Sequence, residues 1–341
     1  MDFLARVRSC ASGLVMAVAV SIAGAAAQTP VRVTLDSKFE GPSAPFLVGL
    51  DKGYYKAEGL DATIDPAAGP LEPITRVASG AYDIGFADIN ALIKFRDRNP
   101  GTPIKAVFMV YNRPPFAIVT RKSRGVAKPK DLEGKKLGAP AADSAFAQWK
   151  IFVKANGIDA AKVEVEDVAN AVREPMLAAG QVDAITGSSF SSYVNLKDRG
   201  VPVDDIAVLL MSDYGVNLYG NAIIVGQKFA AAHPEAVRGF LRAVTRGLKD
   251  TIRDPAAAVD SVVKRNDAVT KDLELERLRM ALKDNVLTPE VEANGFGAVD
   301  MARLDGAIGQ LALTYDFKTR PKASDIFDPS FLPPAAARIT N

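Results

Sequence analysis

The stretch V-A-S-G-A-Y-D-I-G-F-A-D (residues 77–88) occurs a second time, 100 positions later, as L-A-A-G-Q-V-D-A-I-T-G-S (residues 177–188). Each copy is typical of a helix end, a glycine in the left-handed conformation (Gly80, Gly180) and a short buried strand. The strands are predicted to end at Asp88 and Ser188. Ligands bind outside the carboxyl ends of strands in open parallel sheets, so the two copies predict two lobes around one cleft. A single echo of this kind would also fit any helix–glycine–strand junction.

Two further segments are repeated in the same order along the chain. S-A-P-F (residues 43–46) returns as S-A-F (residues 144–146), and K-A-E-G-L-D (residues 56–61) returns as K-A-N-G-I-D (residues 154–159). Strand and helix patterns alternate around them, which indicates α/β lobes with helices covering parallel strands. We therefore predict a duplicated α/β fold, with lobe 1 at residues 28–121 and 222–341 and lobe 2 at residues 122–221.

Composition restricts the class of partner. The 341 residues are 48% hydrophobic and 24% charged, with a net charge of +2. These values fit a globular protein of two domains or one large one. The balance of charge predicts no nucleic-acid partner, and we expect a monomer.

The N-terminus has the three-part pattern of a secretory signal peptide. Arg6 and Arg8 precede an apolar run, and the small residues 25–27 stand before Gln28. Cys10, the only cysteine, comes before the apolar run, whereas a lipid-anchored cysteine would follow it. We therefore predict a signal peptide at residues 1–27, no lipid anchor at Cys10 and a periplasmic location. A buried N-terminal helix is the alternative.

The residue inventory gives little support to catalysis or to cofactors. His233 is the only histidine, and with Cys10 in the predicted leader no catalytic triad or zinc site can be assembled. A phosphate-binding loop of the type G-x-x-x-x-G-K-[ST] is absent. We predict no metal, no cofactor and no enzymatic activity, although catalysis by carboxylates alone stays open.

Loop ends next to predicted strands and helices supply the candidate ligand contacts. Helix starts at Ser43 and Ser144 could offer backbone amides to an anion, or could be ordinary caps. Phe39 and Phe190 could enclose a flat ligand, or could pack on their own lobes. Asp88 would suit a ligand amine, whereas Arg113 would suit an acid; either could instead serve lobe closure or be a plain surface charge. The predicted ligand-binding set is Phe39, Ser43, Asp88, Asn90, Asn112, Asp143, Ser144, Ser188, Ser189, Phe190, Tyr214 and Tyr219.

A family resemblance is carried by F-L-V-G-L-D-K-G-Y-Y-K-A-E-G-L-D (residues 46–61) and S-G-A-Y-D-I-G-F-A-D (residues 79–88). These segments resemble the periplasmic substrate-binding proteins of ABC transporters, in the nitrate/sulfonate/taurine and thiamine-pyrimidine group. The resemblance implies a type II periplasmic-binding fold, whose two lobes are joined by two hinge strands and close around a ligand. It also implies delivery to a membrane permease driven by a separate ATPase.

The ligand is less defined by this resemblance. Pyrimidine binders of the group carry a Trp-containing segment after the first strand, where this chain has D-S-K-F-E-G (residues 36–41). We therefore expect a small organic anion of the sulfonate or taurine kind, with a thiamine-precursor pyrimidine as the alternative. Pyrimidine synthases that share the fold use a histidine and a cysteine-rich motif. This chain lacks that motif. A periplasmic sensor that presents its ligand to a membrane receptor is a third possibility.

Overall fold

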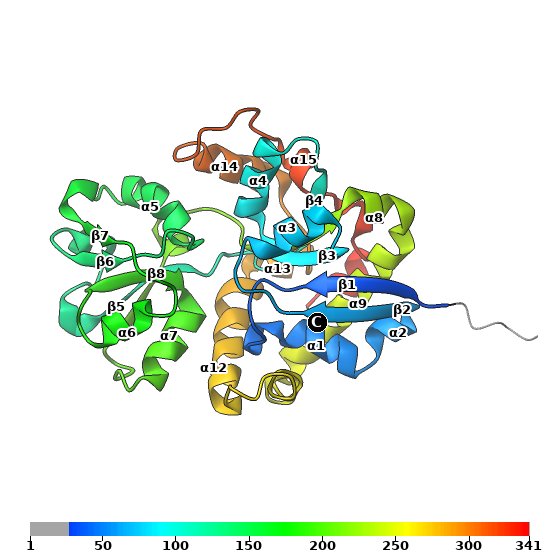
Figure 1. Ribbon diagram of the computed structural model, residues 1–341, viewed down its shortest axis with the longest axis horizontal. Coiled ribbons are helices and arrows are strands. Elements are labelled where there is room, and N and C mark those ends of the chain that lie inside the picture. The colour runs from blue at the N-terminus through cyan, green and yellow to red at the C-terminus, as the bar shows by residue number, and fades with distance from the viewer. Residues whose placement is uncertain (1–26, 341) are drawn as a thin grey trace, which may run out of the picture.

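A computed structural model describes residues 27–340 and contains two mixed sheets flanked by helices (Figure 1). The predicted signal peptide, including Cys10, lies outside the described residues apart from Ala27. The α/β class and the two-lobed arrangement are confirmed.

The first sheet has the strand order β2-β1-β3-β10-β4. Strand β1 runs parallel to β2 and β3, while β10 enters antiparallel between β3 and β4. The bounds are β1 Thr29–Thr34, β2 Leu60–Asp65, β3 Ile84–Asp88, β4 Ile104–Met109 and β10 Asn221–Gly226.

The second sheet repeats this plan in the order β7-β6-β8-β5-β9. Strand β6 is parallel to β7 and β8, and β5 enters antiparallel between β8 and β9. The bounds are β5 Phe116–Arg121, β6 Lys136–Gly138, β7 Glu164–Glu166, β8 Ala184–Ser188 and β9 Ile206–Leu210. Each sheet therefore takes its antiparallel strand from a chain segment that has just crossed from the other sheet.

Strand β5 departs from the predicted lobe boundary. We expected the first lobe to continue to residue 121, but β5 pairs with β8 and β9 of the second sheet. The apolar sequence of β5 does not distinguish one sheet from the other, because both offer it a buried central position. The chain thus crosses between sheets at residues 110–115 and returns at residues 211–220. The full lobe division stays a prediction.

Helices cover both faces of each sheet (Figure 1). On one face of the first sheet, Phe46 of α1 and Phe240 of α9 share a hydrophobic cluster with strand residues such as Val33. A second cluster joins α4 and α14 on the opposite face and continues into the second sheet through Leu218 and Tyr219. The helices are α1 Ala44–Asp51, α2 Tyr54–Ala57, α3 Glu72–Ser79, α4 Ile89–Arg98, α5 Trp149–Ala155, α6 Arg173–Ala178, α7 Ser189–Asp198, α8 Gln227–Ala232, α9 Pro234–Arg253, α10 Pro255–Ala258, α11 Asp260–Val263, α12 Lys271–Ala281, α13 Pro289–Asn294, α14 Met301–Leu311, α15 Ala323–Ile326 and α16 Ala335–Arg338.

The repeated motif has the predicted conformation in both copies. Gly80 and Gly180 follow α3 and α6 with φ angles of 76° and 74°, the left-handed region that glycine enters without steric cost. The strands that follow, β3 and β8, end at Asp88 and Ser188 as predicted.

The predicted helix start at Ser144 is wrong. A short 3₁₀ turn at Phe146–Gln148 precedes α5, which begins at Trp149. Ser43 does stand at the N-terminus of α1, but its side chain makes no capping hydrogen bond there. Its hydroxyl instead accepts a long hydrogen bond of 3.4 Å from the Glu40 amide.

Helix α9 packs so closely on α1 that a side chain at Gly247 has no room. A Cβ atom at this position would lie 2.1 Å from the Pro45 carbonyl oxygen. We predict that Gly247→Ala lowers the free energy of unfolding by at least about 2 kcal/mol, because the helices must separate. Urea denaturation measures this difference.

Gly306 on α14 provides the matched control. No atom lies within 4 Å of a Cβ placed there, so Gly306→Ala should leave stability unchanged or raise it by up to about 1 kcal/mol through helix propensity. Equal losses in the two variants would contradict the packing argument.

Candidate functional site

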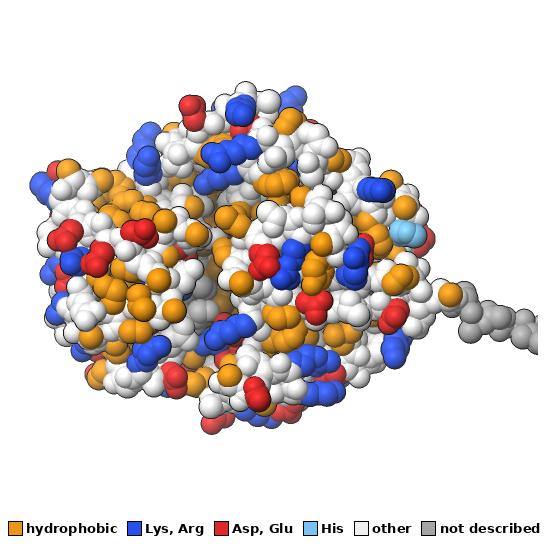
Figure 2. Space-filling view, viewed as in Figure 1, with side chains coloured by type: hydrophobic (Ala, Val, Ile, Leu, Met, Phe, Trp, Pro, Cys, Tyr) orange, Lys and Arg blue, Asp and Glu red, His pale blue; other side chains and the backbone are white. Residues whose placement is uncertain are grey.

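A cavity of about 230 Å³ lies where the carboxyl ends of the two sheets face each other. Its walls come from the segments that follow β1, β2, β6, β7 and β8, from the first crossing and from Asn221 at the start of β10. Figure 2 shows a hollow between the two halves of the molecule. This is the cleft location that the paired strand ends predicted.

Three carboxyl groups line the cavity: Asp36, Glu40 and Asp143. Asp36 Oδ2 accepts a hydrogen bond of 2.6 Å from Asn221 Nδ2, which joins the loop after β1 to the start of β10. Burial raises the pKa of Asp36 to about 6, and the neighbouring Glu40 carboxylate adds to this rise. Asp36 is therefore an acceptor whose charge changes near neutral pH.

Arg173 is the only basic residue on this wall among the described residues. Its Nη1 lies 3.4 Å from Asp143 Oδ1, and its Nε donates to Glu174 Oε1 at 2.9 Å. Ser192 Oγ also donates to Glu174 Oε1 at 2.8 Å. Two carboxylates thus offset one guanidinium, so the cavity has an excess of hydrogen-bond acceptors.

Three aromatic rings form a continuous wall across the cleft. Phe86 of β3 contacts Tyr111 edge to face with 5.4 Å between ring centroids. Tyr111 lies in the first crossing and contacts Phe190 of α7, whose centroid is 6.2 Å away. The wall joins both lobes through the crossing, and such rings suit a flat apolar surface.

A hydroxyl group without a partner faces the same space. Ser188 lines the cavity at the end of β8, and its buried Oγ has no hydrogen-bond partner among residues 27–340. Buried polar atoms are nearly always paired in native proteins. Ser188 is therefore a suitable contact for a bound molecule.

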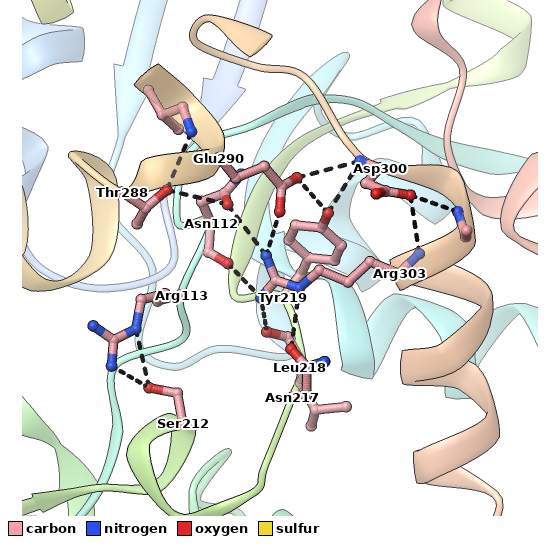
Figure 3. Close-up of polar contacts among 12 residues, drawn as sticks. Asn112, Arg113, Ser212, Asn217, Leu218, Tyr219, Thr288, Glu290, Asp300 and Arg303 are labelled. Carbon is pink, nitrogen blue, oxygen red and sulfur yellow. Dashed lines mark hydrogen bonds and ion pairs between the residues drawn. The ribbon is translucent and has the colours of Figure 1, made fainter. Parts of the chain in front are cut away.

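Arg303 of α14 holds the two crossings together, as Figure 3 shows. Its Nη2 donates to the carbonyl oxygens of Asn112, at 3.0 Å, and Leu218, at 2.9 Å. The guanidinium stacks on the Tyr219 ring at 4.0 Å and pairs with Glu290 at 2.6 Å. The cluster is structural, because it satisfies backbone carbonyls that no sheet can reach.

Arg113 adds a second link between the crossings. Its Nη2 donates to Ser212 Oγ at 2.9 Å and also to the Asp213 carboxylate. Arg113 is not part of the cavity wall, and its contacts give it a structural role between the crossings.

The lobes also touch on one side of the cleft, where α7 lies against α12. Arg277 of α12 donates to Asn195 Oδ1 of α7 at 2.9 Å. The same guanidinium is 3.3 Å from Glu40 Oε1 and is paired with Glu274. Lys197 and Glu276 form a further pair at 2.5 Å. Contact between the lobes is thus connected directly to a carboxylate of the cavity wall.

Five of the twelve predicted ligand-binding residues line the cavity: Ser43, Asp143, Ser144, Ser188 and Phe190. Phe190 reaches it from the first turn of α7 rather than from the predicted loop. Their role in binding stays a prediction.

The other seven do not line this cavity. Phe39 packs on the core of the first lobe, and Tyr214 contacts Phe152. Asn112 and Tyr219 belong to the Arg303 cluster. Ser189 is buried in the first turn of α7 and donates its amide to the Pro115 carbonyl.

Asp88 and Asn90 form a capping pair instead. Asp88 Oδ1 accepts from the Asn90 amide and from Asn90 Nδ2, at 3.0 and 2.7 Å. Asn90 Nδ2 also donates to the Tyr219 carbonyl at 2.7 Å. Burial raises the pKa of Asp88. Asp88 lines a neighbouring cavity rather than the first one.

The strongest polar contacts of the cavity were missed. Asp36 and Glu40 directly follow β1, a strand end that we used only to compare with pyrimidine binders. Arg173 begins α6, shortly before the repeated motif. It follows the carboxyl end of β7, so the expectation that ligand contacts follow strand ends could have identified it. Tyr111 gave no signal, because it reads as the end of an apolar strand.

No helix within residues 27–340 is long and apolar enough to cross a membrane. In the same part of the chain, no three histidine, cysteine or acidic side chains are arranged as a metal site.

Comparison with known proteins identifies the family. The chain matches the NMT1/THI5-like family over residues 41–258. It is similar to the riboflavin-binding protein RibY of Chloroflexus aurantiacus, at 31% identity over 237 residues that cover 69% of this chain and 66% of that protein. A formylaminopyrimidine-binding protein of Halalkalibacterium halodurans is 26% identical over 242 residues, covering 69% and 72%. The chain thus spans about two thirds of the length of these relatives.

Other relatives, including one of Schizosaccharomyces pombe, are named 4-amino-5-hydroxymethyl-2-methylpyrimidine phosphate synthases. Among solved structures, the periplasmic aliphatic sulphonate binding protein SsuA of Escherichia coli superposes with a TM-score of 0.66 at 14% identity, covering 87% of this chain and 96% of that one. The fold is therefore that of the periplasmic binding proteins, and the chain belongs to the NMT1/THI5-like family.

Proposed function

We propose that this protein is a solute-binding component of an importer that captures a compact, flat nitrogen heterocycle carrying N–H groups. The observation that carries the proposal is the cavity wall, which combines three aromatic rings with an excess of carboxylates. Ring or amino N–H groups would donate to Asp36 and Glu40, while Phe86, Tyr111 and Phe190 would contact the ring.

This proposal chooses the alternative ligand over the sulfonate or taurine-like anion that we first expected. An anion would meet the negative charge of Asp36, which has no ion-pair partner among residues 27–340, whereas Arg173 is already paired with Asp143 and Glu174. The expected helix start at Ser144, which would have offered amides to an anion, is absent. The names of RibY and of the formylaminopyrimidine-binding relative agree with a nitrogen heterocycle.

Binding rather than catalysis is supported by what surrounds the cavity. His233 lies between α8 and α9, where its ring packs on Phe229 at 5.1 Å, and it is not part of the cavity wall. The predicted leader, a periplasmic location, a monomeric state and a permease with its ATPase complete the proposal. Its mechanism is closure of two lobes about the Arg303 hinge.

A thermal-shift panel tests the ligand class. We expect an aminopyrimidine or a flavin to raise the stability of the protein, by about 2.7 kcal/mol at about one hundred times its dissociation constant. Taurine, alkanesulfonates and nitrate should not displace the heterocycle, because the carboxylates of the first cavity repel anions. Recovery of the unchanged compound, measured by mass spectrometry, should accompany binding.

Two variants test whether the ligand binds in the first cavity. Asp36→Asn should weaken heterocycle binding by roughly tenfold or more, the contribution of a charged hydrogen bond. Asp61→Asn alters an exposed carboxylate of β2 and should not change the affinity. If only sulfonates stabilised the protein, the ligand would be an anion and the proposal would be wrong. If a heterocycle were chemically converted, the protein would be an enzyme rather than a receptor.

The raised pKa of Asp36 also predicts a pH dependence of stability without ligand. The folded chain holds this proton more tightly than the unfolded chain, in which the pKa is near 3.8. Stability therefore falls as pH rises from about 4 to about 6, by about 2–3 kcal/mol in total. Asp36→Asn removes this loss. The free energy of unfolding of the variant, minus that of the wild type, should therefore increase between about pH 4 and about pH 6 and stay constant at higher pH.

Urea unfolding at several pH values measures the difference between the two proteins. Asp61→Asn serves again as the control and should run parallel to the wild type. A wild-type-like profile for Asp36→Asn would show that this carboxyl group does not titrate near pH 6.

A further inference from the structure

A second cavity, of about 490 Å³, lies beside the first in the cleft. It is bounded by α4 on the first lobe and by residues 141–148 on the second. Residues 142–144 line both cavities, so one short segment of chain separates them. The two spaces differ in charge.

Two basic side chains of α4, Lys94 and Arg98, line the second cavity on one face of the helix. Arg98 Nε donates to Tyr315 Oη at 2.6 Å, and this contact holds its guanidinium beside the tyrosine ring. Neither cation has an ion-pair partner within 4 Å among residues 27–340. Figure 2 shows basic side chains gathered near α4, above the hollow.

Lys94 is the more informative of the two. Lys94 is partly buried, and its Nζ lies 5.5 Å from the centre of the Tyr315 ring and donates no hydrogen bond within residues 27–340. Burial lowers the pKa of Lys94, while the charge of Asp88 opposes this decrease. A desolvated cation without an acceptor is costly unless an anion is bound beside it.

The acidic residues of this cavity do not neutralise the two cations by contact. Asp143 is paired with Arg173. Asp88 is buried and caps α4, and burial raises the pKa of its carboxyl group. Asp97, on the same helix, accepts from the amides of residues 318–320 and is not part of the wall.

Gln148 supplies an independent sign of a missing partner. Its side chain is 1% exposed and lines the cavity, yet Oε1 has no hydrogen-bond partner in residues 27–340. Its Nε2 makes only a long contact of 3.3 Å with the Ser144 carbonyl. Its Oε1 can therefore accept a hydrogen bond from a bound group that carries an O–H, such as hydrogen phosphate.

We propose that the second cavity is a binding site for an oxyanion, a carboxylate or a phosphate group. Lys94 and Arg98 supply the charge, and Gln148 Oε1 accepts a hydrogen bond from an O–H of the bound group. The group can belong to a separate small anion or to an acidic extension of a molecule in the first cavity. The proposal does not depend on the ligand class of the first cavity.

Trp149, the only tryptophan, follows Gln148 in the chain and reports on this site. We expect inorganic phosphate or succinate to change its fluorescence in a saturable way, with a stoichiometry of one by calorimetry. Lys94→Gln and Arg98→Gln should each weaken binding on the order of tenfold. Lys228→Gln removes the same charge from exposed α8 and should bind like the wild type.

Several outcomes would overturn the proposal. These are the absence of binding of both probes by fluorescence and calorimetry, or equal weakening in Lys228→Gln, which would indicate a general charge effect. Circular dichroism and thermal melting confirm that each variant is folded. Saturating the first cavity with its ligand beforehand distinguishes a separate anion from an acidic extension of that ligand. Phosphate still binds if the second cavity takes a separate anion. Phosphate is blocked if an extension of the first ligand occupies the second cavity. Failure of every heterocycle in the thermal-shift panel leaves the phosphate measurement unaffected.

Discussion

The double crossing of the chain, held by Arg303, is the constraint on which the rest of the structure depends. Strands β5 and β10 each join the sheet of the opposite lobe, so the polypeptide must pass between the lobes twice at one place. The crossing segments leave the sheets, and their carbonyl groups need other partners. One guanidinium donates to both segments, at Asn112 and Leu218, and stacks on Tyr219. Its own position is maintained by Glu290.

The geometry of the cleft follows from this arrangement. Tyr111 belongs to a crossing and contacts one ring from each lobe, so the aromatic wall is centred on the hinge itself. On the closing side, Arg277 contacts Asn195 of the second lobe and Glu40 of the cavity. A movement of α7 relative to α12 therefore changes the surroundings of a carboxylate that faces the ligand space. Lobe position and cavity chemistry are linked through a single buried side chain.

The sequence predicts the plan of this fold better than it predicts the site. The repeated motif located the ends of β3 and β8 to the residue, because helix, left-handed glycine and buried strand are local patterns. Strand β5 could not be assigned to a sheet, since its partners are chosen by tertiary contacts. Asn112 and Tyr219 were correctly placed near strand ends, but the Arg303 side chain that contacts them comes from a helix far along the chain, 191 residues beyond Asn112. Asp36 and Arg173 follow the same strand-end rule and were overlooked.

The two cavities also show how acidic and basic side chains can line one cleft without forming ion pairs with each other. Opposite charges placed on one wall pair with each other, as Arg173 and Asp143 do, and then offer less to a ligand. Residues 142–144 separate the carboxylates Asp36 and Glu40 from the cations Lys94 and Arg98. Asp36 on one side and Lys94 on the other therefore have no ion-pair partner among residues 27–340. A segment of three residues from the second lobe thus determines that the cleft presents one acidic and one basic surface, side by side.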